Sequence, residues 1–231
     1  PMIENFSDSE YSIVYNGQIY NTKELRDILI ENGFSFSGHS DTEVLLKSYI
    51  HYGKNVVNHL NGIFAFAIWD TNNNEIFLAR DHFGVKPLFY TKIDETLVFS
   101  SEIKALFQYP GVKKVLNEQS ISELFGIGPA HTSGTTIFKN IYEIKPAHFG
   151  IFNKNGFNIK RYWKLKSEKH VDTFEETCEK LKFLLNDAIT RQLVSDMPLC
   201  TFLSGGLDSS IITKFASDYC EKQGLPPLDT Y

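Results

Sequence analysis

The chain has 231 residues, of which 42% are hydrophobic and 22% are charged, so it is long enough for one or two globular domains with a sizeable core. Its formal net charge of −5 and its pI near 5.8 argue against a surface for nucleic acid or for anionic membranes. The longest apolar runs, such as residues 63–69, are far shorter than a membrane span, and the first residues lack the basic and apolar regions of a secretion signal, so we expect a cytoplasmic protein without a membrane partner.

The first predicted element is a β-hairpin. Residues 11–15 and 18–20 are rich in β-forming side chains and flank Asn16-Gly17, a pair that is typical of a two-residue type I′ turn. On this pattern alone, Asn16 and Gly17 are turn residues.

Two amphipathic helices are predicted next. The first is capped by Asn21 or Thr22 and ends at residues 32–33. The second begins with a capping box at residues 40–43 and ends at Gly53. Since each helix has one apolar face, both should lie on a sheet.

Short β-rich runs separated by turn residues predict that sheet, and their close spacing favours antiparallel pairing. The run at residues 63–68 has almost no polar alternation, so it should be covered on both faces, as in a sheet that packs on a second sheet with helices outside. The predicted strands are residues 63–69, 75–79, 88–90 and 96–99.

The rest of the first domain carries weaker signals. A helix is expected over residues 102–107, and the segment 110–161 is rich in turn residues, with brief strands near 135–138 and 148–152.

A second, α/β domain should begin near residue 173. Residues 164–172 are polar and are typical of a linker, and Thr173 with Glu176 forms a capping box for a long amphipathic helix. One strand, one loop and one further helix follow, which is too little for a covered parallel sheet. We therefore expect a domain that is cut short or completed by something else.

The loop of the second domain is the segment Ser204-Gly205-Gly206-Leu207-Asp208-Ser209-Ser210. It lies between an apolar run and a helical pattern, where free backbone N–H groups, two glycines and several hydroxyls suit an anion such as phosphate. It is neither a G-x-x-x-x-G-K-[ST] loop nor a G-x-G-x-x-G loop. A Gly-Gly turn before a helix capped by Asp208 or Ser209 is the structural alternative.

The cysteines and histidines indicate no metal site. Cys178, Cys200 and Cys220 are widely spaced and confined to the last quarter of the chain, which favours buried thiols over a disulfide framework or a zinc site. The seven histidines form no pair at metal-ligand spacing beside a carboxylate or a cysteine.

Several of these segments resemble a known family in order along the chain. The loop is similar to the S-G-G-x-D-S pyrophosphate loop of ATP pyrophosphatases, and nearly the whole chain resembles the glutamine-dependent asparagine synthetases. The further motifs are Y-N-G-Q-I-Y-N at residues 15–21, S-D-T-E at 40–43, A-R-D with Gly84, Lys86 and Pro87 at 79–87, and S-E-I-K-A-L at 101–106.

The resemblance implies an α+β fold in two parts. Residues 1–165 would form a class II glutamine amidotransferase domain, an N-terminal-nucleophile hydrolase-type αββα sandwich of antiparallel sheets. Residues 173–231 would begin an α/β pyrophosphate-loop domain, similar to adenine nucleotide hydrolases, that binds ATP.

The resemblance also implies roles in glutamine hydrolysis. In the family, an N-terminal cysteine attacks the side-chain amide and its own α-amine acts as the base. Asn16 and Gly17 match the oxyanion hole and contact glutamine, and Asp41 matches the residue that holds the α-amino group of glutamine. Gln18 stands in this substrate site where the family motif has a glutamate. Asp41 is also a carboxylate that the helix dipole favours at a first turn.

In the synthetase half, the resemblance implies that ATP adenylates the β-carboxylate of aspartate, and that ammonia from glutamine arrives through an internal tunnel and displaces AMP. Glutamine and aspartate are the implied substrates, Mg²⁺ the implied metal, and a homodimer an assembly that the resemblance admits. Asp208 matches the residue that places Mg²⁺, and the loop positions that match the ATP contacts are Leu203, Ser204, Gly205, Gly206, Asp208, Ser209 and Ser210.

Two alternatives and one further departure from the family stay open. Another adenylating relative, such as a β-lactam-forming synthetase or an amidotransferase for a modified sugar or peptide, would carry the same motifs, and so would a noncatalytic paralogue that binds glutamine or nucleotide. The chain begins with Pro1 and has no cysteine before Cys178, so we expect an inactive fragment that lacks the nucleophile segment and the rest of the synthetase domain. Arg80 and Asp81 are expected to form a structural ion pair beneath the site rather than to act in chemistry.

Overall fold

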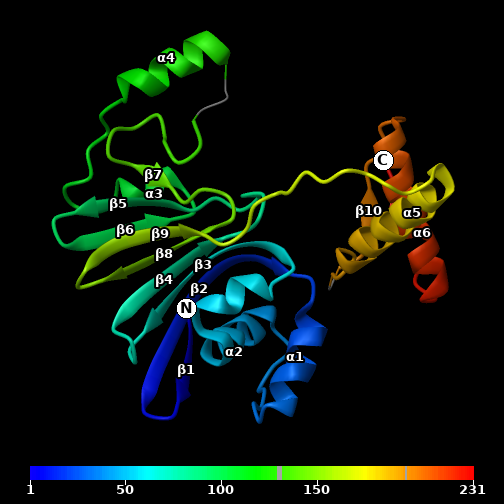
Figure 1. Ribbon diagram of the computed structural model, residues 1–231, viewed down its shortest axis with the longest axis horizontal. Helices are drawn as coiled ribbons and strands as arrows, with labels where there is room; N and C mark the ends of the chain where they lie inside the picture. Colours follow the sequence, from blue (N-terminus) through cyan, green and yellow to red (C-terminus); the bar gives the residue numbers. More distant parts are fainter. Residues whose placement is uncertain (129–131, 196) are drawn as a thin grey trace. The chain divides into compact units, whose positions relative to one another are not determined.

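The computed structural model describes residues 1–128, 132–195 and 197–231, and it divides into two units, Pro1–Leu165 and Lys166–Tyr231 (Figure 1). Across the described ranges, no helix combines the length and the apolar character that crossing a membrane requires.

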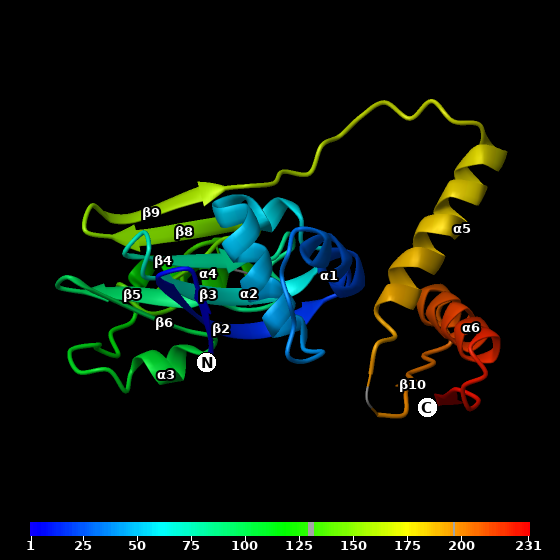
Figure 2. The ribbon, with the colours of Figure 1, turned by 90° about the horizontal axis from the view of Figure 1, so that it is seen from below.

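The first unit is built on a six-stranded sheet in which every neighbouring pair is antiparallel (Figures 1 and 2). The order β1-β2-β3-β4-β8-β9 places β3 near the middle. The strands are β1 (Met2–Phe6), β2 (Ser9–Ile19), β3 (Gly62–Asp70), β4 (Glu75–Arg80), β8 (His148–Asn153) and β9 (Gly156–Arg161).

The hairpin predicted at Asn16-Gly17 is wrong, because β2 runs straight through both residues. Strand β2 pairs with β3 from Tyr11 opposite Asp70 to Ile19 opposite Gly62. A Cβ on Gly17 would lie 2.2 Å from the carbonyl oxygen of Ile63, so the glycine permits close approach of two strands instead of a turn.

One face of the large sheet is covered by α1 (Thr22–Glu31), α2 (Asp41–Tyr52) and the 3₁₀ helix η1 (Gly53–Asn58). The predicted start of α2 is confirmed, because the Ser40 hydroxyl accepts a hydrogen bond from Glu43 N–H at 3.3 Å. Its predicted end is also confirmed, since Gly53 has a φ of 58° that favours glycine. The core beneath these helices contains Leu25, Leu29, Leu45, Phe64, Phe66 and Phe77.

The other face packs on a three-stranded sheet of order β6-β5-β7, formed by β5 (Phe89–Ile93), β6 (Thr96–Ser100) and β7 (Tyr142–Glu143). Ala65 and Ala67 of β3 contribute to this second core with Leu88 and Leu97. Strand β3 is therefore covered on both faces, as its unbroken apolar run predicts.

The segment 110–161 is more regular than its composition indicates. It holds α4 (Glu118–Ile127), whose cap Asn117 accepts a hydrogen bond from Gln119 N–H at 3.1 Å. The strand predicted at 135–138 is wrong, since this segment forms only two isolated bridges. The short helix α3 (Ile103–Leu106) lies inside the predicted range 102–107.

The second unit contains α5 (Phe174–Arg191), β10 (Cys200–Thr201), α6 (Leu207–Lys222) and β11 (Asp229–Thr230). The capping box of α5 is complete, and β10 pairs in parallel with β11. No residue of α5 is fully buried. The expectation of buried thiols is correct for Cys220 but wrong for Cys178 and Cys200, because the described part of this unit does not cover their faces of α5 and β10.

Candidate functional site

The candidate site lies at the edge of β2 that faces away from β3. Asp81 N–H donates to the Phe64 carbonyl at 2.8 Å, and Phe64 N–H donates to Asp81 Oδ2 at 3.3 Å, so both backbone groups of Phe64 are directed to the β4 side. Gly17, which is opposite Phe64, is therefore a non-hydrogen-bonded partner in the antiparallel ladder. Its N–H points away from β3, toward the outer edge of β2.

Strand β1 covers only the first part of this edge, because its pairing ends with Met2 opposite Ile13. In the part of the chain that the structure describes, no strand pairs with β2 along the edge from residue 14 to residue 19. Among the described residues, the Gly17 N–H therefore points to a stretch of edge that no strand covers.

Asp41 lies beside the same edge. Its Oδ2 accepts hydrogen bonds from the Tyr15 hydroxyl at 2.8 Å and from the Ile19 N–H at 3.2 Å. Tyr15 and Ile19 flank Gly17, two residues away on either side. Asp41 is also the first residue of α2, where the helix dipole stabilises a carboxylate.

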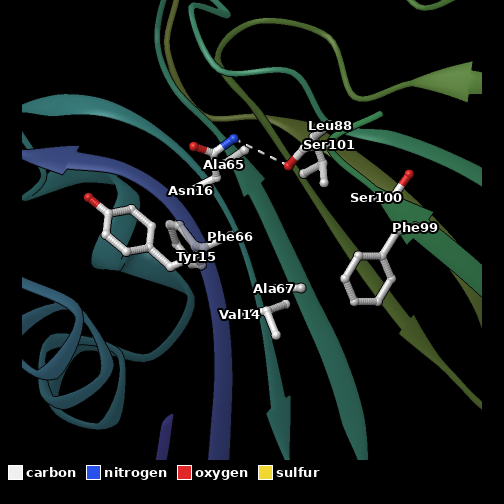
Figure 3. A pocket seen from close by; sticks show the side chains of 10 residues that line it. All are labelled: Val14, Tyr15, Asn16, Ala65, Phe66, Ala67, Leu88, Phe99, Ser100 and Ser101. Carbon is white, nitrogen blue, oxygen red and sulfur yellow. Dashed lines mark hydrogen bonds between the residues drawn. The ribbon is translucent and has the colours of Figure 1, made fainter. Parts of the chain in front are cut away.

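The Asn16 side chain lies on the face of β2 opposite to that of Tyr15, because side chains alternate along the strand. It lines a cavity of about 360 Å³ between the two sheets, together with Ala65, Ala67 and Phe99, and its Nδ2 donates to Ser101 Oγ at 3.3 Å. Figure 3 shows the Asn16 amide directed to Ser101 and the Tyr15 ring extending away from Ser101. One strand thus presents an amide donor on one face and a backbone donor at its edge.

The loop that leads into Asp41 is held by a buried charge pair. The Glu43 carboxylate accepts hydrogen bonds from Ser37 N–H at 2.8 Å, Gly38 N–H at 2.9 Å and the Lys47 ammonium at 2.7 Å. Burial alone would raise the pKa of Glu43, but the bonds from Lys47, Ser37 and Gly38 outweigh it and lower that pKa to about 2. The Lys47 ammonium also donates to the Ser35 carbonyl at 2.6 Å, so the loop and the start of α2 are fixed together.

Arg80 and Asp81 do not form the predicted ion pair with each other. Arg80 pairs with the buried Glu143 at 3.0 Å. Asp81 accepts backbone hydrogen bonds from Phe83, Val85 and Lys86 as well as from Phe64. Both residues therefore fix the loop after β4, which agrees with a structural role but not with the expected partners.

Sequence reasoning missed two residues that touch the candidate site, Tyr15 and Ser101. Each stands at one end of a motif that the sequence does show, Y-N-G-Q-I-Y-N and S-E-I-K-A-L. A motif does not show which residue its side chains contact, however. Tyr15 contacts Asp41, 26 residues away, and Ser101 contacts Asn16, 85 residues away.

The glycine loop of the second unit has the geometry of an open helix N-terminus. Gly206 is the N-cap of α6 and no side chain caps the helix, so capping by Asp208 or Ser209 is not what the structure shows. Gly205 has a φ of +81°, and a Cβ built on it would meet nothing within 4 Å. Asp208 is exposed in the first turn of α6.

The hydroxyl groups of the loop are held close to this N-terminus. Ser204 Oγ and Ser209 Oγ lie 2.9 Å apart, and the Ser210 hydroxyl donates to the Gly206 carbonyl at 2.8 Å. Leu203, just before the loop, is anchored by its N–H, which donates to the Tyr231 carbonyl at 2.8 Å. An anion at this helix end would meet backbone N–H groups and hydroxyls together.

Comparisons with known proteins match the two units of the chain to two different families. A family model described as a glutamine amidotransferase domain matches residues 1–163, and one described as asparagine synthase matches residues 180–231. The chain is 53% identical over 231 residues to asparagine synthetase [glutamine-hydrolyzing] 3 of Bacillus subtilis (strain 168), covering 100% of this chain and 38% of that protein. It is 36% identical to asparagine synthetase [glutamine-hydrolyzing] 2 of the same organism, covering 94% of this chain and 30% of that protein.

The chain therefore spans well under half the length of these curated relatives. Among solved structures, glutamine phosphoribosylpyrophosphate amidotransferase from B. subtilis is similar with a TM-score of 0.50 and 19% identity, covering 98% of this chain and 47% of that one. This likeness concerns the fold, and it confirms the predicted sandwich of antiparallel sheets and helices.

Proposed function

Since the chain belongs to the glutamine amidotransferase domain family through residues 1–163, we propose that its first unit takes part in releasing ammonia from glutamine and that its second unit begins the half that consumes it. The complete activity would be that of an asparagine synthetase, an ATP-dependent carbon–nitrogen ligase with glutamine as amido donor. The similarity of residues 180–231 to asparagine synthase and the 53% identity to a B. subtilis protein of that name support this assignment.

The observation that carries the glutaminase proposal is the grouping of Asn16, Gly17 and Asp41 around one strand. Attack on the amide carbon of glutamine moves negative charge to the amide oxygen, and N–H donors that already point at this oxygen lower the barrier. The Gly17 N–H would be one such donor, and the second hydrogen of the Asn16 amide, whose Nδ2 donates to Ser101 Oγ, would be the other. The Asp41 carboxylate would accept the α-ammonium group of the substrate. Gln18 would add a neutral acceptor beside it.

The attacking thiol would come from outside the first unit, because the cysteines of the chain are Cys178, Cys200 and Cys220, all in the second unit. The proposal therefore has to be tested in a protein that supplies this thiol. A chimera in which this chain replaces the matching segment of the 53% identical B. subtilis protein keeps all 231 residues and adds the flanking segments of the relative.

For the second unit we propose ATP and aspartate as substrates. The uncapped N-terminus of α6 and the open Gly205 fit a pyrophosphate group. The hydroxyls of Ser204, Ser209 and Ser210, which bond within the loop, would turn to donate to it. Asp208 is a single exposed carboxylate, which suits Mg²⁺ that keeps waters and phosphate oxygens as its other ligands. Bound Mg²⁺ would neutralise phosphate charge as the leaving group departs. A homodimer stays a prediction that sedimentation would test.

The chimera should form asparagine with either glutamine or ammonia as nitrogen source. Asn16→Ala should lower glutamine-dependent turnover by about 10² to 10³ and leave ammonia-dependent turnover largely intact, because only amide hydrolysis uses the oxyanion hole. Asn32→Ala, at the exposed end of α1, is the matched control and should change neither rate. An equal loss of both rates in Asn16→Ala would indicate a collapsed strand, and a chimera that makes no asparagine would overturn the proposed function.

A further inference from the structure

The two carboxylate oxygens of Asp41 have unequal surroundings. Oδ2 is occupied by two donors of the protein, the Tyr15 hydroxyl at 2.8 Å and the Ile19 N–H at 3.2 Å. Within the described residues, no hydrogen bond from the protein reaches Oδ1. One oxygen is committed to the protein, and the other keeps its lone pairs for a ligand.

We propose that Tyr15 is a positioning residue for glutamine: its hydroxyl holds the Asp41 carboxylate so that Oδ1 receives the α-ammonium group of the substrate. The inference rests on the proposed glutaminase function and extends it to a residue that does not itself touch the substrate. Tyr15 would act on substrate binding through Asp41 alone.

The geometry favours a fixed carboxylate. Both donors to Oδ2 belong to β2, the strand that also carries Asn16 and Gly17, so the ammonium site and the oxyanion donors are placed by one rigid element. The Tyr15 ring is half-buried against the core beneath the helices, which restricts the position of its hydroxyl. A carboxylate held by two donors loses little rotamer freedom when it binds an ammonium group.

The hydroxyl also stays protonated in the range where an enzyme works. The pKa of Tyr15 is raised above its ordinary value, chiefly by burial and secondly by the adjacent Asp41 charge. The hydrogen bond to Oδ2 is therefore retained at neutral and mildly alkaline pH. The proposed role does not depend on a titration near neutrality.

The test uses Tyr15→Phe in the chimera, with Tyr49→Phe as a matched control. Tyr49 is buried in the same core and its hydroxyl donates to another aspartate, Asp70, at 3.1 Å. Steady-state kinetics would give kcat and KM for glutamine. Competition against glutamine would give the dissociation constant of glutaramate, which is glutamine without its α-amino group.

Tyr15→Phe should raise the KM for glutamine about tenfold, since a hydrogen bond to a charged group is lost, with kcat changed less than about twofold. The affinity for glutaramate should stay within about twofold of wild type, because this ligand has no ammonium group for Oδ1. In an Asp41→Asn background, Tyr15→Phe should have less than about a twofold further effect. Tyr49→Phe should change none of these values.

A conservative variant distinguishes loss of the hydrogen bond from a folding defect. Replacing Tyr15 with 4-aminophenylalanine keeps a donor at the same place, so the KM for glutamine should return to within about threefold of wild type. An unchanged KM in Tyr15→Phe, or equal losses for glutamine and glutaramate, would overturn the positioning role while the proposed function stands. A wild-type chimera without glutaminase activity would overturn the proposed function first.

Discussion

Gln18 is the residue at which the chain departs from the family motif that its sequence resembles, which has a glutamate there. It lies on β2 two residues after Asn16, so the two side chains share a face of the strand, and it is half-buried. An amide oxygen can accept a hydrogen bond from an ammonium group but brings no charge. Asp41 would then be the main source of charge for the substrate ammonium.

Restoring the carboxylate should tighten glutamine binding. A charge-assisted hydrogen bond exceeds a neutral one by very roughly 1 kcal/mol, so Gln18→Glu in the chimera should lower the KM for glutamine about fivefold. Ammonia-dependent synthesis should not change. Gln108→Glu, at an exposed position, adds the same charge elsewhere and serves as the control. A KM that stays the same or rises would show that residue 18 does not face the ammonium group.

Among the elements, helix α2 has the most direct link to the site, because its first residue is Asp41 and its second turn carries Lys47. The buried pair Glu43–Lys47 holds the loop that enters the helix. Such a pair is costly to break, since the buried Lys47 ammonium would keep only the Glu4 carboxylate, 3.6 Å away, as its ion-pair partner.

This pair predicts a loss of stability at acid pH. The pKa of Glu43 is lowered from 4.5 to about 2 in the folded chain, so its stabilisation is complete above pH 4.5 and disappears as the pH falls toward 2. Urea unfolding of the 231-residue chain should show a gap in unfolding free energy between wild type and Glu43→Gln that is constant above pH 5 and narrows below about 4.5. Glu118→Gln, at the exposed start of α4, controls for general charge effects. A gap that does not change with pH would contradict the Glu43 assignment.

At the scale of the whole molecule, a substitution in one unit should abolish the reaction of that unit and spare the other. If Asp208 places Mg²⁺ as proposed, Asp208→Ala in the chimera should abolish aspartate-dependent exchange of pyrophosphate into ATP. Glutamine hydrolysis should continue, since its residues lie in the first unit. Asp218→Ala, which removes an ion pair with Lys214 on the same helix, is the control and should affect neither reaction. Unchanged exchange in Asp208→Ala would contradict the assignment of the loop.

Sequence alone determined the features that depend on neighbouring residues. The caps of α2 and α5, the glycine loop before α6 and the apolar run of β3 follow from local patterns, and the structure has them all. Strands β1 and β9 and helix α4 were missed, since exposed strands and a short, largely exposed helix carry little hydrophobic periodicity.

Only the tertiary structure decided where Asn16-Gly17 and Asp41 lie relative to their partners. Pairing with β3 overrides the local turn preference of Asn16-Gly17, because a continuous ladder forms more hydrogen bonds and buries more apolar surface than an isolated turn. The bonds from Tyr15 to Asp41 and from Asn16 to Ser101 join residues far apart in sequence. A local pattern identifies the chemical groups, but the chain must fold before any distance between them exists.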